Sequence, residues 1–260
     1  MIYLRNLIDR IPSMLVPSVP SMRMFQVAGH SALIYLLFTG TALEWMVCLF
    51  VYLLQVSVGG TVTLHRLLAH KAFKSPKWFE YIGSLIVVVG NYTSPLAWVA
   101  LHREHHAFTD TEKDPHSPLF FGYWRIQFRS MDRLPRIKFV PDLLRSKFHM
   151  FIHKYFSLII LSHISILCII DPRAVVYAWL VPGILIWHAS SLINTLNHSP
   201  LGYKNYNTKD VSVNNPFTGL VSAGEGWHNN HHAQPANPNF GHKWWEFDLG
   251  YQIIKLVRIK

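Results

Sequence analysis

Histidine is the residue type in this sequence whose number and spacing could do chemistry. The chain carries 16 histidines, more than its 14 aspartates and glutamates together. Three short motifs hold half of them: HRLLAH at residues 65–70, HREHH at 102–106 and HNNHH at 228–232. In the second and third motifs, the spacing i, i+3, i+4 places three imidazoles on one face of a helix. Imidazole is a ligand for zinc, copper, iron and nickel, so we predict a metal site.

The number of imidazoles indicates two metal ions, because eight or more nitrogen donors exceed what one ion can accept. His65 and His70 would lie about 140° apart on an ideal α-helix, so we expect them to bracket a helix end just beyond a membrane span. A ninth candidate, His198, lies four residues after Asn194 on the same helical face. The histidines of the three motifs are His65, His70, His102, His105, His106, His228, His231 and His232.

Carboxylates close to the motifs are expected to orient the ligands, because a metal-bound imidazole usually donates its second ring N–H to such a group. Asp110, Asp114 and Glu225 lie near enough in the sequence to serve. We interpret His116, which follows Asp114-Pro115, as a structural residue. The remaining histidines are interpreted as packing or surface residues: His30, His149, His153, His163, His188 and His242.

The composition indicates a membrane protein. Hydrophobic residues make up 50% of the chain and charged residues 15%, against about 25% charged in an average soluble domain. Four apolar runs approach the roughly 20 residues needed to cross a bilayer. Very short turns join them in pairs, so we expect two helical hairpins. The runs are residues 25–43, 45–64, 155–170 and 174–193.

The formal charge of +10 would suit nucleic acid or a membrane, but its distribution favours a membrane and no nucleic acid. If all four runs span, every one of the 24 lysines and arginines except Arg173 lies on one side. The positive-inside rule places that side, with both termini, in the cytoplasm. We therefore predict an all-α single domain over residues 1–260, whose cytoplasmic cap comes from residues 65–154 and 198–260. Residues 81–90 are expected to form a helix buried in this cap or lying on the membrane.

The motifs resemble those of the membrane fatty acid desaturases, a family that includes acyl-CoA and acyl-lipid delta-9 enzymes. HRLLAH is similar to the family's HxxxxH box, HREHH to its first HxxHH box, and GEGWHNNHH at residues 224–232 to its last. Asn194 and His198 match the NxxxH element, and residues 109–118 and Trp98 are also similar. The resemblance covers about residues 25–250. It implies four transmembrane helices under a cytoplasmic cap, two irons about midway along a bent acyl tunnel, nine histidine ligands including His198, and a water held by Asn194 on one iron.

Desaturation removes two hydrogens from adjacent, unactivated carbons. No acid or base side chain can do this, so a redox metal and O2 are required. We predict two external electrons per turnover from a separate donor, because the sequence has no haem, flavin or ferredoxin motif. An acidic donor such as ferredoxin or a cytochrome would suit the basic cytoplasmic face, although attraction to anionic lipid explains the same charges equally well. The face comprises Arg125, Arg129, Arg133, Arg136 and Lys138.

Two other functions are compatible with the histidine motifs. A lipid, alkane or carotenoid hydroxylase or ketolase would use the same scaffold, but the contexts of the motifs favour desaturation. A metal transporter should carry its ligands inside the spans, whereas these motifs lie outside them. The sequence leaves open whether the acyl carrier is CoA, a lipid or a carrier protein. A delta-9 double bond is expected only from the resemblance.

Overall fold

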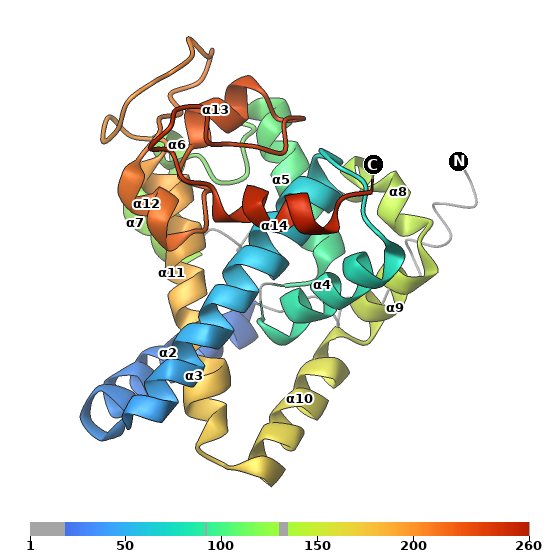
Figure 1. Ribbon diagram of the computed structural model, residues 1–260, viewed down its shortest axis with the longest axis vertical. Coiled ribbons are helices and arrows are strands. Elements are labelled where there is room, and N and C mark those ends of the chain that lie inside the picture. Colours follow the sequence, from blue (N-terminus) through green and yellow to red (C-terminus); the bar gives the residue numbers. More distant parts are fainter. Residues whose placement is uncertain (1–18, 92, 130–134, 260) are drawn as a thin grey trace.

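The computed structural model describes residues 19–91, 93–129 and 135–259. These residues form helices and loops, with two isolated β-bridges that join Tyr203 to Asn214 and Asn214 to Trp227. Long helices extend from one end of the molecule, and shorter helices and loops gather at the other (Figure 1). The described part of the protein is thus all-helical, as predicted.

The helices of the described residues range from 3 to 21 residues in length. They are α2 (Val19–Thr39), α3 (Ala42–Leu54), η2 (Gln55–Ala69), α4 (Lys77–Val89), α5 (Pro95–Phe108), α6 (Pro118–Phe121), α7 (Tyr123–Arg129), η3 (Ile137–Phe139), α8 (Pro141–Leu144), α9 (Lys147–Lys154), α10 (Phe156–Ile170), η4 (Val176–Leu180), α11 (Val181–Leu196), α12 (Pro216–Val221), α13 (His228–Ala233) and α14 (Leu249–Val257).

The first hairpin consists of α2 and α3. Thr41 caps α3, because its hydroxyl accepts the Glu44 backbone N–H while the Glu44 carboxylate accepts the Thr41 backbone N–H. This capping box starts α3 at Ala42, rather than at the predicted residue 45. Arg173, in the turn of the second hairpin, donates from Nε to Glu44 at 2.7 Å. An ion pair therefore joins the turns of the two hairpins.

The second span continues beyond α3 as a π-helix, η2, which carries the first histidine motif. The His70 backbone N–H donates to the His65 carbonyl at 3.0 Å, and the helix ends there as expected. Hydrogen bonds of this i→i+5 type place residues five apart above one another. The two rings accordingly lie on the same side, with centroids 4.9 Å apart. The predicted separation of about 140° between His65 and His70 was wrong, because it assumed an α-helix and the turns of the π-helix η2 are wider.

Two helices in the described residues are long and apolar enough to cross a bilayer. They are the continuous helix Ala42–Ala69 and the helix Val176–Leu196. A third crossing results if α9 and α10, which are bent by 67° relative to each other, act as one span. The protein is thus a membrane protein. The first of the predicted spans, at residues 25–43, stays a prediction.

A buried hydrophobic core fixes the first two histidine motifs relative to each other. Buried apolar side chains of η2, α4, α5 and α14 meet there, among them Val62, Val87, Leu96 and Ile254. A Cβ at Gly83 of α4 would overlap the Thr63 side chain of η2, so the glycine permits close packing of the two helices. α4 covers the run predicted at residues 81–90, and it is not among the candidate spans.

Candidate metal centre

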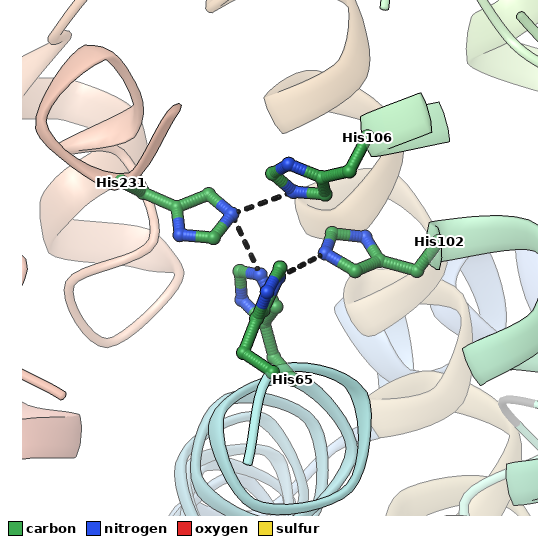
Figure 2. Close-up of side chains that lie close together, drawn as sticks. His65, His102, His106 and His231 are labelled. Carbon is green, nitrogen blue, oxygen red and sulfur yellow. Dashed lines mark hydrogen bonds between the residues drawn. The ribbon is translucent and has the colours of Figure 1, made fainter. Parts of the chain in front are cut away.

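Five imidazoles from η2, α5 and α13 converge on one point, and we call them the five-histidine cluster. They are His65, His70, His102, His106 and His231. The Nε2 atoms of His70 and His102 lie 2.8 Å apart, and Nε2 of His231 lies 2.8 Å from that of His106 and 3.1 Å from that of His65. Figure 2 shows four of these rings pointing toward one another. A single Nε2 offers one proton or one lone pair, so a cation among them satisfies the set better than hydrogen bonds do.

Four further imidazoles form a second, adjoining group, the four-histidine cluster. They are His105, His198, His228 and His232. The Nε2 atom of His228 lies 3.1 Å from that of His198 and 3.0 Å from that of His232. Each HxxHH motif contributes to both clusters, because its two adjacent histidines lie in different ones. The structure thus divides the nine predicted ligands five to four between two sites, a division that the sequence left open.

Four carboxylates accept hydrogen bonds from the outer nitrogens of the clustered rings. With Nδ1–H committed to a carboxylate, a neutral imidazole has its lone pair on Nε2, the atom that faces the cluster. The pairs are His65 with Glu225, His105 with Asp114 at 2.9 Å, His198 with Asp110 at 3.0 Å and His232 with Asp210 at 3.1 Å. The sequence predicted three of these carboxylates. It missed Asp210, which lies in a loop far from every motif.

The electrostatics of the clusters suit divalent cations. Burial, followed by repulsion from neighbouring imidazoles, lowers the pKa of His70 to about 2 and the pKa values of His102 and His231 well below the usual range. The rings are therefore neutral, which is the form that binds metal. Burial raises the pKa of Asp210, but the interactions with His232 and the hydrogen bonds from Ser212 together outweigh this effect and hold the pKa far below its usual range. Four carboxylates can balance the positive charges of two divalent ions, so the donor set fits a pair of such ions.

A buried arginine ties the first motif to the C-terminal segment. Arg66 donates to Asp248 Oδ2 at 2.8 Å and to Glu225 Oε1 at 3.4 Å, and its guanidinium lies 3.8 Å from the centroid of the Phe240 ring. The Phe240 ring in turn lies 4.5 Å from the ring of His231, measured between centroids. Arg66 thus holds Glu225, the carboxylate that orients His65. It also supports the Phe240 ring, which packs against His231.

One cavity runs along both clusters. His65 and His102 of the five-histidine cluster line it, together with His105 and His228 of the four-histidine cluster. Most of its other walls come from the two candidate spans and from α5, among them Val56, Gly60, Trp98, Leu101, Ile193 and Asn194. His116, Ser222 and Glu225 complete the lining. The cavity therefore brings apolar surface from within the spans directly beside both candidate metal sites.

The other predicted residues divide into those near the cavity and those remote from it. Asn194 lies in the cavity wall, and so does His116, for which the sequence indicates a structural role. Outside the clusters, Nε2 of His30 and Nε2 of His188 lie 2.9 Å apart, and Gln127 donates to Nδ1 of His188 at 2.9 Å. Hydrogen bonds within the chain therefore account for this pair, without a metal ion.

The predicted basic face is only partly available to an electron-donor protein. Arg136 forms a 3.1 Å ion pair with Glu104, a fully buried carboxylate within the second motif. Arg125 lies over the ring of Phe121. Lys138 lies over the ring of Phe139. Arg133 and the side chain of Arg129 lie outside the described residues.

Comparison with known proteins agrees with this geometry. A family model described as "Fatty acid desaturase" matches residues 43–256, a region that contains all nine clustered histidines. An acyl-CoA C20 Delta5-desaturase from Anemone leveillei is 34% identical over 232 residues, which cover 85% of this chain and 74% of the relative. An sn-2 palmitoyl-lipid 9-desaturase from Nostoc sp. (strain 36) is also 34% identical, over 85% of this chain and 80% of the relative. Delta-9 acyl-lipid desaturase 2 from Arabidopsis thaliana is 35% identical over 90% of this chain and 78% of its own length.

Proposed function

Because the chain belongs to the fatty acid desaturase family and is an oxidoreductase, we propose that it uses two iron ions and O2 to introduce a cis double bond into a long acyl chain. The observation that carries the proposal is the pair of adjoining imidazole clusters along a single cavity whose far walls are apolar. Such a cavity can present an unactivated hydrocarbon chain to two redox metals at once. A bond at the delta-9 position is the expected product.

The overall reaction balances with two external electrons. A –CH2–CH2– pair loses two electrons and two protons, O2 accepts those electrons and two more from a donor, and two water molecules form with two further protons from solvent. Bound iron supplies the activation of O2 that abstraction from such carbons requires. The nine clustered histidines are the proposed ligands, and Asn194 is proposed to hold a water beside one ion.

In the proposed mechanism, the residues of the chain orient the metal ligands, align the acyl chain and exclude water. Glu225, Asp114, Asp110 and Asp210 keep the protons of four imidazoles on Nδ1 and so direct the Nε2 lone pairs inward. The Trp98 ring stacks on His102 with an interplanar angle of 12°, which fixes that ligand from the cavity side. The apolar wall contributed by Val56 and Ile193 keeps water from the site and aligns one pair of methylenes with it.

The proposed topology has four spans, with both termini and the metal centre in the cytoplasm. An electron donor such as ferredoxin or a cytochrome would approach the cytoplasmic face near Arg125 and Lys138. Arg136 contributes less to such an encounter than the sequence suggested, because Glu104 already neutralises it. Acyl-CoA and acyl-lipid substrates are both consistent with the relatives.

The proposal is tested by expressing the protein in a host that lacks its own desaturase and analysing extracted lipids by mass spectrometry. The expected result is a new double bond in a long acyl chain, absent from a His105→Ala variant. A hydroxylated or oxidised chain without a new double bond would instead identify a hydroxylase or ketolase. Metal accumulation without any lipid product would favour transport.

A further inference from the structure

His116 is a buried imidazole without a hydrogen-bond partner on either ring nitrogen among the described residues. Its side chain lies in the wall of the cavity, and the residue is 7% exposed. Leaving a buried polar group unpaired is costly, so such a group in a working site implies a partner that is not part of the chain. An imidazole offers an N–H donor and, in its neutral form, one acceptor nitrogen as well.

The position of this ring is determined by a carboxylate that also orients a candidate ligand. The backbone N–H of His116 donates to Asp114 Oδ1 at 3.0 Å, while Asp114 Oδ2 accepts from His105 Nδ1 at 2.9 Å. The imidazole of His116 then stacks on that of His105, with centroids 4.6 Å apart. The ring is thus held beside the four-histidine cluster before any ligand arrives.

The orientation of the ring argues against a tenth metal ligand. A lone pair lies in the plane of its imidazole, so rings that bind one ion point at it from different directions. In the four-histidine cluster, His105 makes interplanar angles of 82° with His198 and 71° with His232. His116 instead stacks on His105, with an interplanar angle of 27° and ring centroids 4.6 Å apart, and it is not part of the four-residue group whose ligand atoms all lie within 4.8 Å of one another. His105, Asp114 and His116 could also be considered as a separate metal site. The hydrogen bond from His105 Nδ1 to Asp114 Oδ2 argues against it, because it already uses the nitrogen and the oxygen that face each other there.

We propose that His116 hydrogen-bonds a small oxygen ligand, water or dioxygen, held at the four-histidine cluster. The inference rests on the proposed function and deepens it, because it gives the cluster with fewer imidazoles a protein group that stabilises an exogenous ligand. His116 would act as a positioning residue for that ligand, in the wall of the cavity that Asn194 also lines.

The test compares the purified, iron-loaded protein with His116→Phe, which keeps the stacked ring but removes both nitrogens, and with His116→Gln, which keeps hydrogen-bonding ability. Nitric oxide is the probe, as a stable analogue of dioxygen. Iron content should be unchanged in both variants. Nitric oxide should bind roughly 5- to 30-fold more weakly to His116→Phe, as expected for loss of one or two kcal/mol. His116→Gln should recover most of the affinity, and the N–O stretching frequency should differ between the wild type and His116→Phe. A His242→Phe variant, whose ring lies outside both clusters, should match the wild type.

Two results would overturn the inference, and a third would refute the proposed function on which it rests. Equal nitric oxide affinity and an equal stretching frequency in all variants would show that His116 does not hydrogen-bond the ligand. Loss of iron in folded His116→Phe, or in His116→Gln if the first variant does not fold, would instead make His116 a ligand. A wild-type protein that binds no iron would refute the proposed function itself, which separates that failure from a failure of the His116 inference.

Discussion

Replacing Asp110 by asparagine separates the charge of an orienting carboxylate from its shape. Asp110 Oδ2 accepts from His198 Nδ1 and from the Val211 backbone N–H, both at 3.0 Å, and Oδ1 accepts from the Ser117 hydroxyl at 3.0 Å. An asparagine with its oxygen in the Oδ2 position retains the first two bonds and can donate to Ser117. The substitution therefore removes mainly the negative charge.

The expected effect follows from the difference between charged and neutral hydrogen bonds. A bond to a charged group contributes about 1.5–3 kcal/mol and a neutral one about 0.5–1.5 kcal/mol. Loss of about 1–1.5 kcal/mol corresponds to roughly 5- to 12-fold weaker retention of the ion at the four-histidine cluster. Glu225→Gln makes the matching change at the five-histidine cluster, because Glu225 accepts from His65.

The assay titrates anaerobic, iron-loaded protein with a ferrous chelator and follows the iron that remains bound. In each variant, half of the iron should become more labile by this factor and half should behave as in the wild type. Glu80→Gln is the matched control, since that carboxylate pairs with Lys77 at 2.8 Å on the protein surface. Release of both ions together, or wild-type behaviour of Asp110→Asn, would refute the division into two separately oriented sites.

Three further changes test the packing and the charges around the centre. Gly83→Ala should cost about 1–3 kcal/mol of stability, measured as a lower melting temperature, because its Cβ meets Thr63; an unchanged melting temperature would contradict the close packing of α4 on η2. Arg66→Met should cost about 3–5 kcal/mol by leaving buried Asp248 and Glu225 without their cation, whereas Lys77→Met should leave stability nearly unchanged. Burial raises the pKa of Asp142, but Arg103 and Lys71 outweigh it and hold the pKa below its usual range. Asp142→Asn should therefore destabilise the protein fully above about pH 4 and progressively less as the pH falls, and a deficit independent of pH would contradict the ion pair.

The histidines of the candidate metal centre could be predicted from the sequence, because their spacing within each motif is a local property. An HxxHH motif on a helix has one geometric outcome, and residues 102–106 and 228–232 show it. The carboxylates beside the motifs, such as Asp114, were found for the same reason. Asp210 was not found, because the fold brings it to His232 from a loop that carries no pattern of its own.

Other features depended on backbone geometry or on packing that no local pattern specifies. The five-residue spacing of His65 and His70 could have indicated a π-helix, since it matches the i→i+5 hydrogen bond, but α-helical geometry was assumed. Arg136 looked like a surface charge because its partner, Glu104, is hidden in the second motif. The unpaired ring of His116 could be recognised only once its surroundings were known.

The most direct test of the account is the metal content and spectrum of the protein purified from cells grown with ⁵⁷Fe. We predict close to two iron ions per chain with nitrogen-rich coordination, and Mössbauer signals from two distinct sites, one for each histidine cluster. A single metal ion per chain, zinc in place of iron, or iron that survives replacement of both His105 and His231 by alanine would contradict it.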